Sequence, residues 1–324
     1  MRTLARSAFF VAACLCASCS RGGGQAQGWP NKPIRFIVPF APGGPADTIG
    51  RLIGYKLSSD LGQQMVVDNR PGAGGNIGTA AAAKSAPDGY TALVTTSAFA
   101  VNATLSTASG YDAEKDFIPT AIIASQPNAI IVSATVPAQN LAELLSWAKT
   151  AKPGFATPGS GTTPHLTAEH LFRSIAGLDM TPIHFKGAGP AITAVIGAQP
   201  PVGAAAISTA LQHIQSGKLR ALAVSSAKRI AALPDVPTLA EAGIAGIEDY
   251  TWIGIFLPAG TPSAIVKRLN DAVNRALRDA ETRAQLDRQA YQPVGGTPEE
   301  FRDYVRSEIG KWGKVVREAN IQPE

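Results

Sequence analysis

Short apolar runs alternate with amphipathic stretches along most of the chain. The first unit has an apolar run at 34–38, a turn of glycine and proline at 41–45, and apolar residues at helical spacing from 49 to 57. This order of strand, loop and helix recurs as far as residue 224 and is typical of α/β sheets whose strands are largely parallel. The further expected strands are 65–67, 91–94, 129–132, 155, 182–184, 201–204 and 219–224, and the expected helices are 75–84, 141–149, 164–175, 187–196 and 207–215.

The pattern changes after Pro234. One apolar run at 250–257 predicts a strand, and three amphipathic stretches at 262–277, 280–289 and 298–319 predict consecutive helices. The first and the last of these helices begin at Thr261-Pro262 and Thr297-Pro298, where proline occupies the first helical position.

The chain of 324 residues is long enough for two domains. A body of roughly 300 residues exceeds what a single core usually fills, and no low-complexity linker divides it. We therefore expect two domains joined by crossing strands, with 117–125 and 222–233 as the candidate crossings. Domain I is expected at 27–124 and 227–324, and domain II at 125–226.

The first 26 residues are expected to be an export signal. Basic Arg2 and Arg6 precede an apolar run at 7–17 that is too short to span a bilayer, and cleavage after Ala26 satisfies the small-residue rule. A lipid anchor on Cys19 is the alternative. All three cysteines lie in this segment, so a chain cleaved after Ala26 contains no thiol.

Charge and composition exclude one class of partner. The chain has 29 basic and 24 acidic residues, and three of the basic ones, Arg2, Arg6 and Arg21, lie in the export segment. With only 6% aromatic residues and a small remaining surplus of charge, the body lacks the basic, aromatic surface of a nucleic-acid binder.

A turn between the first strand and the first helix is the first candidate binding element. Pro42, Gly43 and Gly44 precede a helix N-terminus at the carboxyl edge of the expected sheet, where open α/β sheets bind ligands and where free N–H groups attract a carboxylate. Asp47 lies in the first helical turn, where it either caps the helix or positions a bound water. Ala46 stands beside it.

Two further segments offer polar groups. The glycine-rich run 72–78, which contains Asn76, lacks both the Gly-Lys-Ser/Thr ending and the G-x-G-x-x-G pattern of nucleotide sites, so tight packing explains most of its glycines. Residues 95–102 follow a strand and place Ser97, Phe99 and Asn102 at an expected cleft edge, although an ordinary polar loop has the same composition.

The loop 156–165 gathers hydroxyls and backbone N–H groups before a helix. Gly159, Ser160, Gly161 and Thr162 are expected to hold a carboxylate through neutral donors. His165 either donates to the ligand or holds the loop by bonding a backbone carbonyl.

The sequence contains no constellation typical of an enzyme. None of the four histidines forms the H-E-x-x-H pattern of zinc proteases, so neither a metal nor another cofactor is expected. Residues 159–161 do not form the G-x-S-x-G nucleophile elbow. Lys186, in a glycine-rich turn, is a candidate ligand-binding residue, although loop lysines are usually only solvated.

These segments together resemble the periplasmic solute-binding receptors of tripartite tricarboxylate transporters, the Bug family. The resemblance covers the mature length and rests on blocks in the family's order. It implies a two-lobed α/β periplasmic-binding-protein fold, with two mostly parallel sheets and flanking helices around a hinged cleft that holds a small carboxylate. It also implies a periplasmic, monomeric receptor that delivers its ligand to membrane permease subunits. The blocks are residues 29–44 with Asp47, 68–78, 86–90, 159–161 with 165–166, 185–190, 217–224, 233–238, 241–243 and 258–262.

Departures from the family pattern narrow the expected ligand. Residues 197–205 lack the acidic residue that many relatives carry at the position of Ala205, and an acid there suits an ammonium group. Residues 203–206, which include Ala204 and Ala205, are therefore expected to form a roomy apolar wall, and Ala46 replaces a common threonine. The expected ligand is an amine-free acid, either an aliphatic di- or tricarboxylate or an aromatic dicarboxylate such as terephthalate or phthalate. An exported hydrolase or a ligand-sensing signalling receptor is the alternative.

Overall fold

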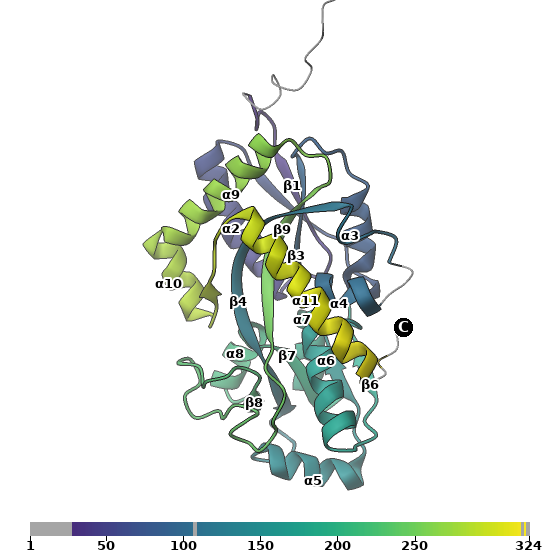
Figure 1. Cartoon of the computed structure of the whole chain (residues 1–324). Coiled ribbons are helices and arrows are strands. Elements are labelled where there is room, and N and C mark those ends of the chain that lie inside the picture. The colour runs from purple at the N-terminus through teal and green to yellow at the C-terminus, as the bar shows by residue number, and fades with distance from the viewer. Residues whose placement is uncertain (1–27, 106–108, 319–320, 322–324) are drawn as a thin grey trace, which may run out of the picture.

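The computed structural model describes residues 28–105, 109–318 and 321, which form two α/β lobes stacked along the long axis of the molecule (Figure 1). The expected export signal, with Cys19 and the cleavage position after Ala26, lies outside these residues. Among the described residues, no helix combines the length and the apolar character needed to cross a membrane.

The first lobe contains the N-terminal strands and the C-terminal helices. Its strands are β1 (Ile34–Val38), β2 (Met65–Asn69), β3 (Thr91–Thr96), β9 (Tyr250–Pro258), β10 (Gln292–Pro293) and the first part of β4 (Phe117–Ser133). Its helices are α2 (Pro45–Leu61), α3 (Asn76–Ala83), α4 (Ala98–Leu105), α9 (Ser263–Arg278), α10 (Ala280–Arg288) and α11 (Pro298–Glu318), with a 3₁₀ turn η1 (Ala73–Gly75) before α3.

The second lobe is built from the middle of the chain. Its strands are β5 (Phe155–Thr157), β6 (Pro182–His184), β7 (Val202–Ala206), β8 (Leu219–Val224) and the last part of β4. Its helices are α5 (Leu141–Ala151), α6 (Thr163–Glu169), α7 (Ala188–Ile196) and α8 (Ile207–Gln215), and α6 continues into a π-helical segment η2 (His170–Ile175).

One strand belongs to both lobes. β4 pairs with β9 as far as Pro127, opposite Tyr250, and from Asn128 onward it pairs with β7 and β8. The sheet order is β2-β1-β3-β9-β4-β7-β5-β6. Pairing is parallel among β1, β2 and β3 and among β5, β6 and β7, but every pair that includes β4 or β9 is antiparallel. The expectation of mostly parallel sheets therefore fails at the strands that cross between the lobes.

The chain returns to the first lobe later than expected. Leu239, Ile244 and Ile247 pack in the same apolar cluster as Phe155 and Phe172 of the second lobe. The expected return at 226–227 is therefore wrong, because this segment supplies apolar surface to the second core. We place the return at β9.

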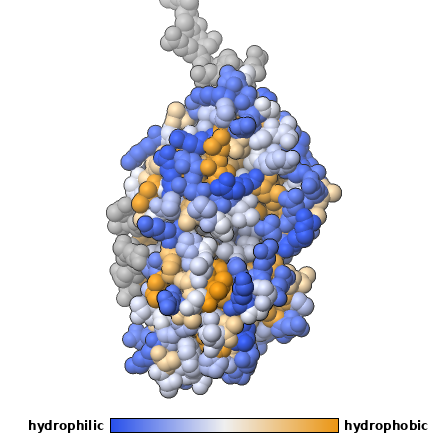
Figure 2. Space-filling model, turned by 180° about the vertical axis from the view of Figure 1, so that it is seen from behind, coloured by the Kyte–Doolittle hydropathy of each residue, from blue (hydrophilic) through white to orange (hydrophobic). Residues whose placement is uncertain are grey.

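Each lobe buries the apolar stripe of its helices against its sheet. On α2, Ile49, Ile53 and Leu57 recur at intervals of four residues and are fully buried in the first-lobe core. The back of the molecule carries only small apolar patches separated by hydrophilic residues (Figure 2).

A buried polar network lies where the lobes join. The carboxyl group of Asp249, just before β9, accepts from the Asn128 amide at 2.6 Å and from the Thr167 hydroxyl at 2.7 Å. The same Thr167 hydroxyl oxygen lies 2.8 Å from the Thr163 carbonyl oxygen, so its single proton is shared between two acceptors. Burial raises the pKa of Asp249 more than these hydrogen bonds and the nearby charge of Lys311 lower it.

Substitution Asp249→Asn tests this carboxyl group, because the amide keeps its shape and cannot ionise. Below the ordinary pKa of 3.8 the carboxyl is protonated in both the folded and the unfolded chain. Above that pH the unfolded chain loses the proton more readily, so the free energy of unfolding falls by up to about 1.4 kcal/mol per pH unit until the raised folded pKa is passed. Urea unfolding between pH 4 and 8 should show this fall in the unaltered chain and not in the variant. Parallel pH profiles would contradict the raised pKa.

Candidate functional site

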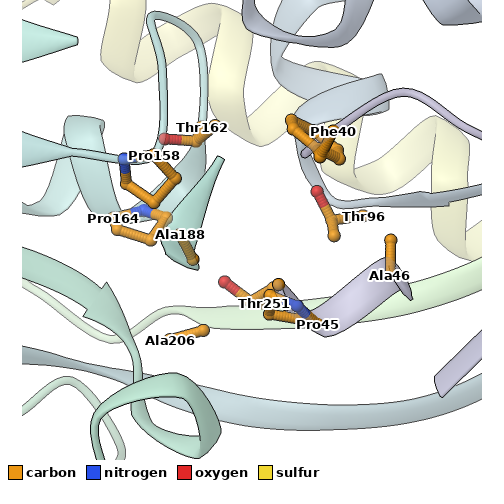
Figure 3. A pocket seen from close by; sticks show the side chains of 11 residues that line it. Phe40, Pro45, Ala46, Thr96, Pro158, Thr162, Pro164, Ala188, Ala206 and Thr251 are labelled. Carbon is orange, nitrogen blue, oxygen red and sulfur yellow. The ribbon is translucent and has the colours of Figure 1, made fainter. Parts of the chain in front are cut away.

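A narrow cavity of about 30 Å³ lies between the two lobes (Figure 3). The first lobe forms one side of it and the second lobe the other. The wall comprises Phe40, Gly44, Pro45, Ala46, Thr96 and Thr251 from the first lobe, and Pro158, Thr162, Pro164, Ala188 and Ala206 from the second.

Four helices begin at this cavity. Residues at the starts of α2, α6, α7 and α8 line it, and none of the four helices has a side-chain hydrogen bond at its N-cap. By contrast, α5 and α10 are capped by the side chains of Asn140 and Asp279, which are both exposed. The starts of α2, α6 and α7 therefore present positive dipole ends and backbone donors without a capping side chain, an arrangement that favours an anion. In α8 the Ser208 N–H donates to the side-chain carbonyl oxygen of Gln126 at 2.7 Å, so this donor is not available to a ligand.

The side chains of the wall are apolar apart from three threonines. The Thr251 hydroxyl donates at 2.7 Å to the side-chain carbonyl of Asn128, which belongs to the buried polar network where the lobes join. It also lies 2.8 Å from the Thr163 hydroxyl. The Thr162 hydroxyl donates to the Gly159 carbonyl at 2.8 Å. No charged side chain of the described residues lines this cavity. An anion bound here is held by neutral donors.

Asp47 supports the wall and does not line the cavity. Its carboxylate accepts from the Gly43 backbone at 3.0 Å and is bound by Arg51 and Asn69. Burial raises the pKa of Asp47, but the hydrogen bonds from Arg51, Gly43 and Asn69 together outweigh burial and leave it below its ordinary value. The carboxylate is thereby used to hold the turn before α2.

His165 holds its own loop. Its Nδ1 accepts from the Gly161 backbone N–H at 3.3 Å, and its ring packs edge-on against His184. The expectation of a bond to a backbone carbonyl is wrong, because the bound group is an N–H. The imidazole is 2% exposed and does not reach the cavity wall.

A second, outer cavity of about 180 Å³ adjoins the first, since both are lined by Phe40 and Pro158. It lies between the turn 72–75 of the first lobe and the loops 158–160 and 184–186 of the second. Three of the expected binding residues, Gly159, Ser160 and Lys186, line it.

Backbone contacts hold the lobes together around these cavities. The Ala41 N–H donates to the Lys186 carbonyl at 2.8 Å. A Cβ at Gly74 would overlap the Ser160 carbonyl oxygen, and one at Gly189 would lie 2.9 Å from the Pro42 carbonyl oxygen. The missing side chains at these two glycines permit this close approach.

The remaining expected residues of the first lobe lie away from the inner cavity. Pro42 and Gly43 line an open groove outside it, and Asn76 accepts from the Tyr111 hydroxyl at 3.0 Å. Ser97 and Asn102 make contacts between the lobes: the Ser97 hydroxyl lies 3.0 Å from that of Thr163, and the Asn102 amide, which donates to Gly74, abuts Gly161.

Three expectations about the wall are wrong. Phe99 is stacked on Phe256 in the first-lobe core, with ring centroids 4.3 Å apart, and is not at the cleft edge. Ala204 and Ala205 belong to the two core clusters on opposite sides of β7. The last residue of that strand, Ala206, lines the cavity. The missing acid at Ala205 therefore does not itself alter the wall.

Sequence reasoning identified Gly44, Ala46 and Thr162 on the inner wall, included Ala206 in the expected apolar wall, and missed Phe40, Thr251 and Ala188 among others. The position of Ala188 as the first residue of an uncapped helix was a usable signal. Thr251 lies inside an apolar strand and carries no local signal. Among the described residues, no group of three or more histidine, cysteine or carboxylate side chains is placed to hold a metal ion.

Residues 49–321 match the family described as the tripartite tricarboxylate transporter family receptor. The chain is similar to the periplasmic binding protein BugD (31% identity, TM-score 0.88, covering 91% of this chain and all of BugD). It is also similar to Rpa4515 of R. palustris, solved with adipate (34% identity, TM-score 0.87, covering 91% of this chain and all of Rpa4515). A third similar structure is MatC of Rhodopseudomonas palustris with bound malate (32% identity, TM-score 0.85, covering 89% of this chain and all of MatC).

Substitution Gly189→Ala should hold the lobes apart. Gly189 has an ordinary helical backbone in α7, where alanine is the better helix former, so the lobe itself should stay folded. The added methyl meets the Pro42 carbonyl across the interface, an overpacking that costs about 1–3 kcal/mol. Hydrogen exchange of the Ala41 amide should therefore be faster by roughly tenfold or more, since each 1.4 kcal/mol is a factor of ten.

The matched control is Gly197→Ala at the end of the same helix, where a Cβ meets only carbonyls of α7 at ordinary distances. Equal Ala41 exchange in both variants would show that the Gly189 contact does not hold the lobes together.

Proposed function

The chain belongs to the tripartite tricarboxylate transporter receptor family, and on this premise we propose that it captures a small amine-free carboxylate between its lobes and delivers it to membrane permease subunits. The solved relatives that hold adipate and malate support a carboxylate as the ligand class. The family, together with the export segment before residue 27, supports action in the periplasm.

The observation that carries this proposal is the convergence of four helix starts, three of them without a capping side chain, on a cavity without charged side chains. Helix N-termini and hydroxyls stabilise an anion without a partner cation. A neutral wall also permits release, because no salt bridge has to be broken when the lobes separate.

The same wall disfavours an ammonium group. No carboxylate of the described residues lines the inner cavity, and the nearest candidate, Asp47, is already bound by Arg51 and Asn69. An ammonium group there would be desolvated beside positive helix ends, at a cost that neutral threonines do not offset. The proposed ligand is therefore an organic acid, either an aliphatic dicarboxylate or an aromatic one such as terephthalate.

The alternatives of an exported hydrolase or a signalling receptor have less support. A hydrolase of the serine type needs a base within hydrogen-bond reach of its nucleophile. The Nδ1 of His165, the nearest imidazole along the loop, is bound to the Gly161 N–H and does not serve Ser160. Ester turnover abolished by Ser160→Ala would favour the hydrolase.

Thermal unfolding of the chain from Gln27 onward, with a panel of acids, tests the proposal. A ligand that binds only the folded protein raises the melting temperature, so at least one amine-free acid should raise it, by an amount that grows with concentration. The panel comprises aliphatic dicarboxylates, citrate, benzoate, the phthalate isomers, aspartate and glutamate. Stabilisation by aspartate or glutamate alone would contradict the amine-free class, and mass spectrometry of the denatured protein would identify a co-purified acid.

Substitution Ala206→Asp tests whether the cavity is the binding site. A carboxylate on the wall should weaken binding of the stabilising acid by roughly 100-fold, because like charges about 5 Å apart repel by about 3 kcal/mol at an intermediate dielectric. Ala206→Asn adds the same bulk without charge and is the matched control. Isothermal titration of both variants decides the matter, and equal affinities would place the ligand elsewhere.

A further inference from the structure

The inner and outer cavities form one path with two different ends. They share Phe40 and Pro158, so the boundary between them is lined by two apolar rings. The inner cavity offers neutral donors, which are backbone N–H groups of helix starts and threonine hydroxyls, whereas the outer cavity is lined by the positively charged Lys186. Lys186 is the one lysine or arginine of the described residues that lines either cavity.

Lys186 has a defined backbone position and an available charge. Its carbonyl accepts from the Ala41 N–H across the lobes, so the loop that carries it is fixed at the rim when the lobes are in contact. No carboxylate of the described residues lies within salt-bridge distance of its ammonium group. This charge is therefore available to a ligand.

The neighbouring histidine adds no charge near neutral pH. Burial, and then the adjacent His165, lowers the pKa of His184 to about 4, and its Nδ1 lies 2.7 Å from the Thr157 hydroxyl. The glycine turn 72–75 forms the facing wall and carries no charged side chain. The electrostatic preference of the outer cavity for an anion therefore comes from Lys186.

We propose that Lys186 binds the second anionic group of a ligand whose first carboxylate lies in the inner cavity. This inference rests on the proposed function and narrows its ligand class. A ligand that reaches both ends has to pass between Phe40 and Pro158, which favours a methylene chain or a flat ring over a hydroxylated middle. The ligand class is thus a dicarboxylate with an apolar centre, for which adipate and terephthalate are suitable probes.

Two pairs of acids isolate the second carboxylate. Adipate and hexanoate share a six-carbon chain, and terephthalate and benzoate share a ring, so within each pair only the distal carboxylate differs. In at least one pair, the unaltered chain should bind the dicarboxylate roughly five- to tenfold more tightly than the monocarboxylate. This ratio of affinities corresponds to a contribution between that of an exposed ion pair and that of a charge-assisted hydrogen bond. In the Lys186→Gln variant the two acids of the pair should bind with about equal affinity, and the affinity for the monocarboxylate should be unchanged. Isothermal titration measures both affinities.

Two control variants separate charge from structure. Lys186→Arg keeps the charge and should keep most of the ratio, and Lys149→Gln removes an exposed lysine of α5 that lines neither cavity and should change nothing. The role of Lys186 is overturned if Lys186→Gln weakens both acids of a pair equally or weakens neither. If no acid of the full panel binds the unaltered chain, the proposed function fails, and this inference fails with it.

Discussion

The backbone hydrogen bonds of β4 are the constraint on which the binding site depends. A single strand of 17 residues passes from one lobe to the other, and its donors and acceptors are satisfied by β9 in the first part and by β7 and β8 in the second. Because both lobes share this strand, the carboxyl ends of their parallel strands face the same gap. The helices that follow those strands therefore begin at one cavity (Figures 1 and 3).

This arrangement explains why the inner wall needs no charged residue. Uncapped helix starts supply donors that are already oriented and need little reorganisation when an anion arrives. The charged residues beside the site have supporting roles: Asp47 holds the turn before α2, and the Asp249 network joins β4, α6 and the start of β9. The charge that we assign to binding, Lys186, lies at the outer end, where solvent reduces the cost of desolvating it.

Glycine determines how closely the lobes approach. At Gly74 and Gly189 the backbone of one lobe lies against a carbonyl of the other, at separations that a methyl group would prevent. The contact between the lobes thus depends on side chains that are missing, and Ala41 and Lys186 complete it with a hydrogen bond. The segments that make these contacts also line the inner and outer cavities.

The sequence by itself predicted most of the strands and helices and the glycine-rich and hydroxyl-rich turns, because apolar periodicity and helix-start residues are local signals. It missed helix α4, and the two lobes were expected from the chain length and the family resemblance. It also placed Gly44, Ala46 and Thr162 correctly on the wall. Only the tertiary structure decided that β4 and β9 run antiparallel between the lobes, that Phe99 belongs to a core, and that Ala206 and not Ala205 faces the cavity. These are long-range outcomes: a strand turns each residue toward one face or the other according to its pairing register, and that register depends on residues far away in the chain.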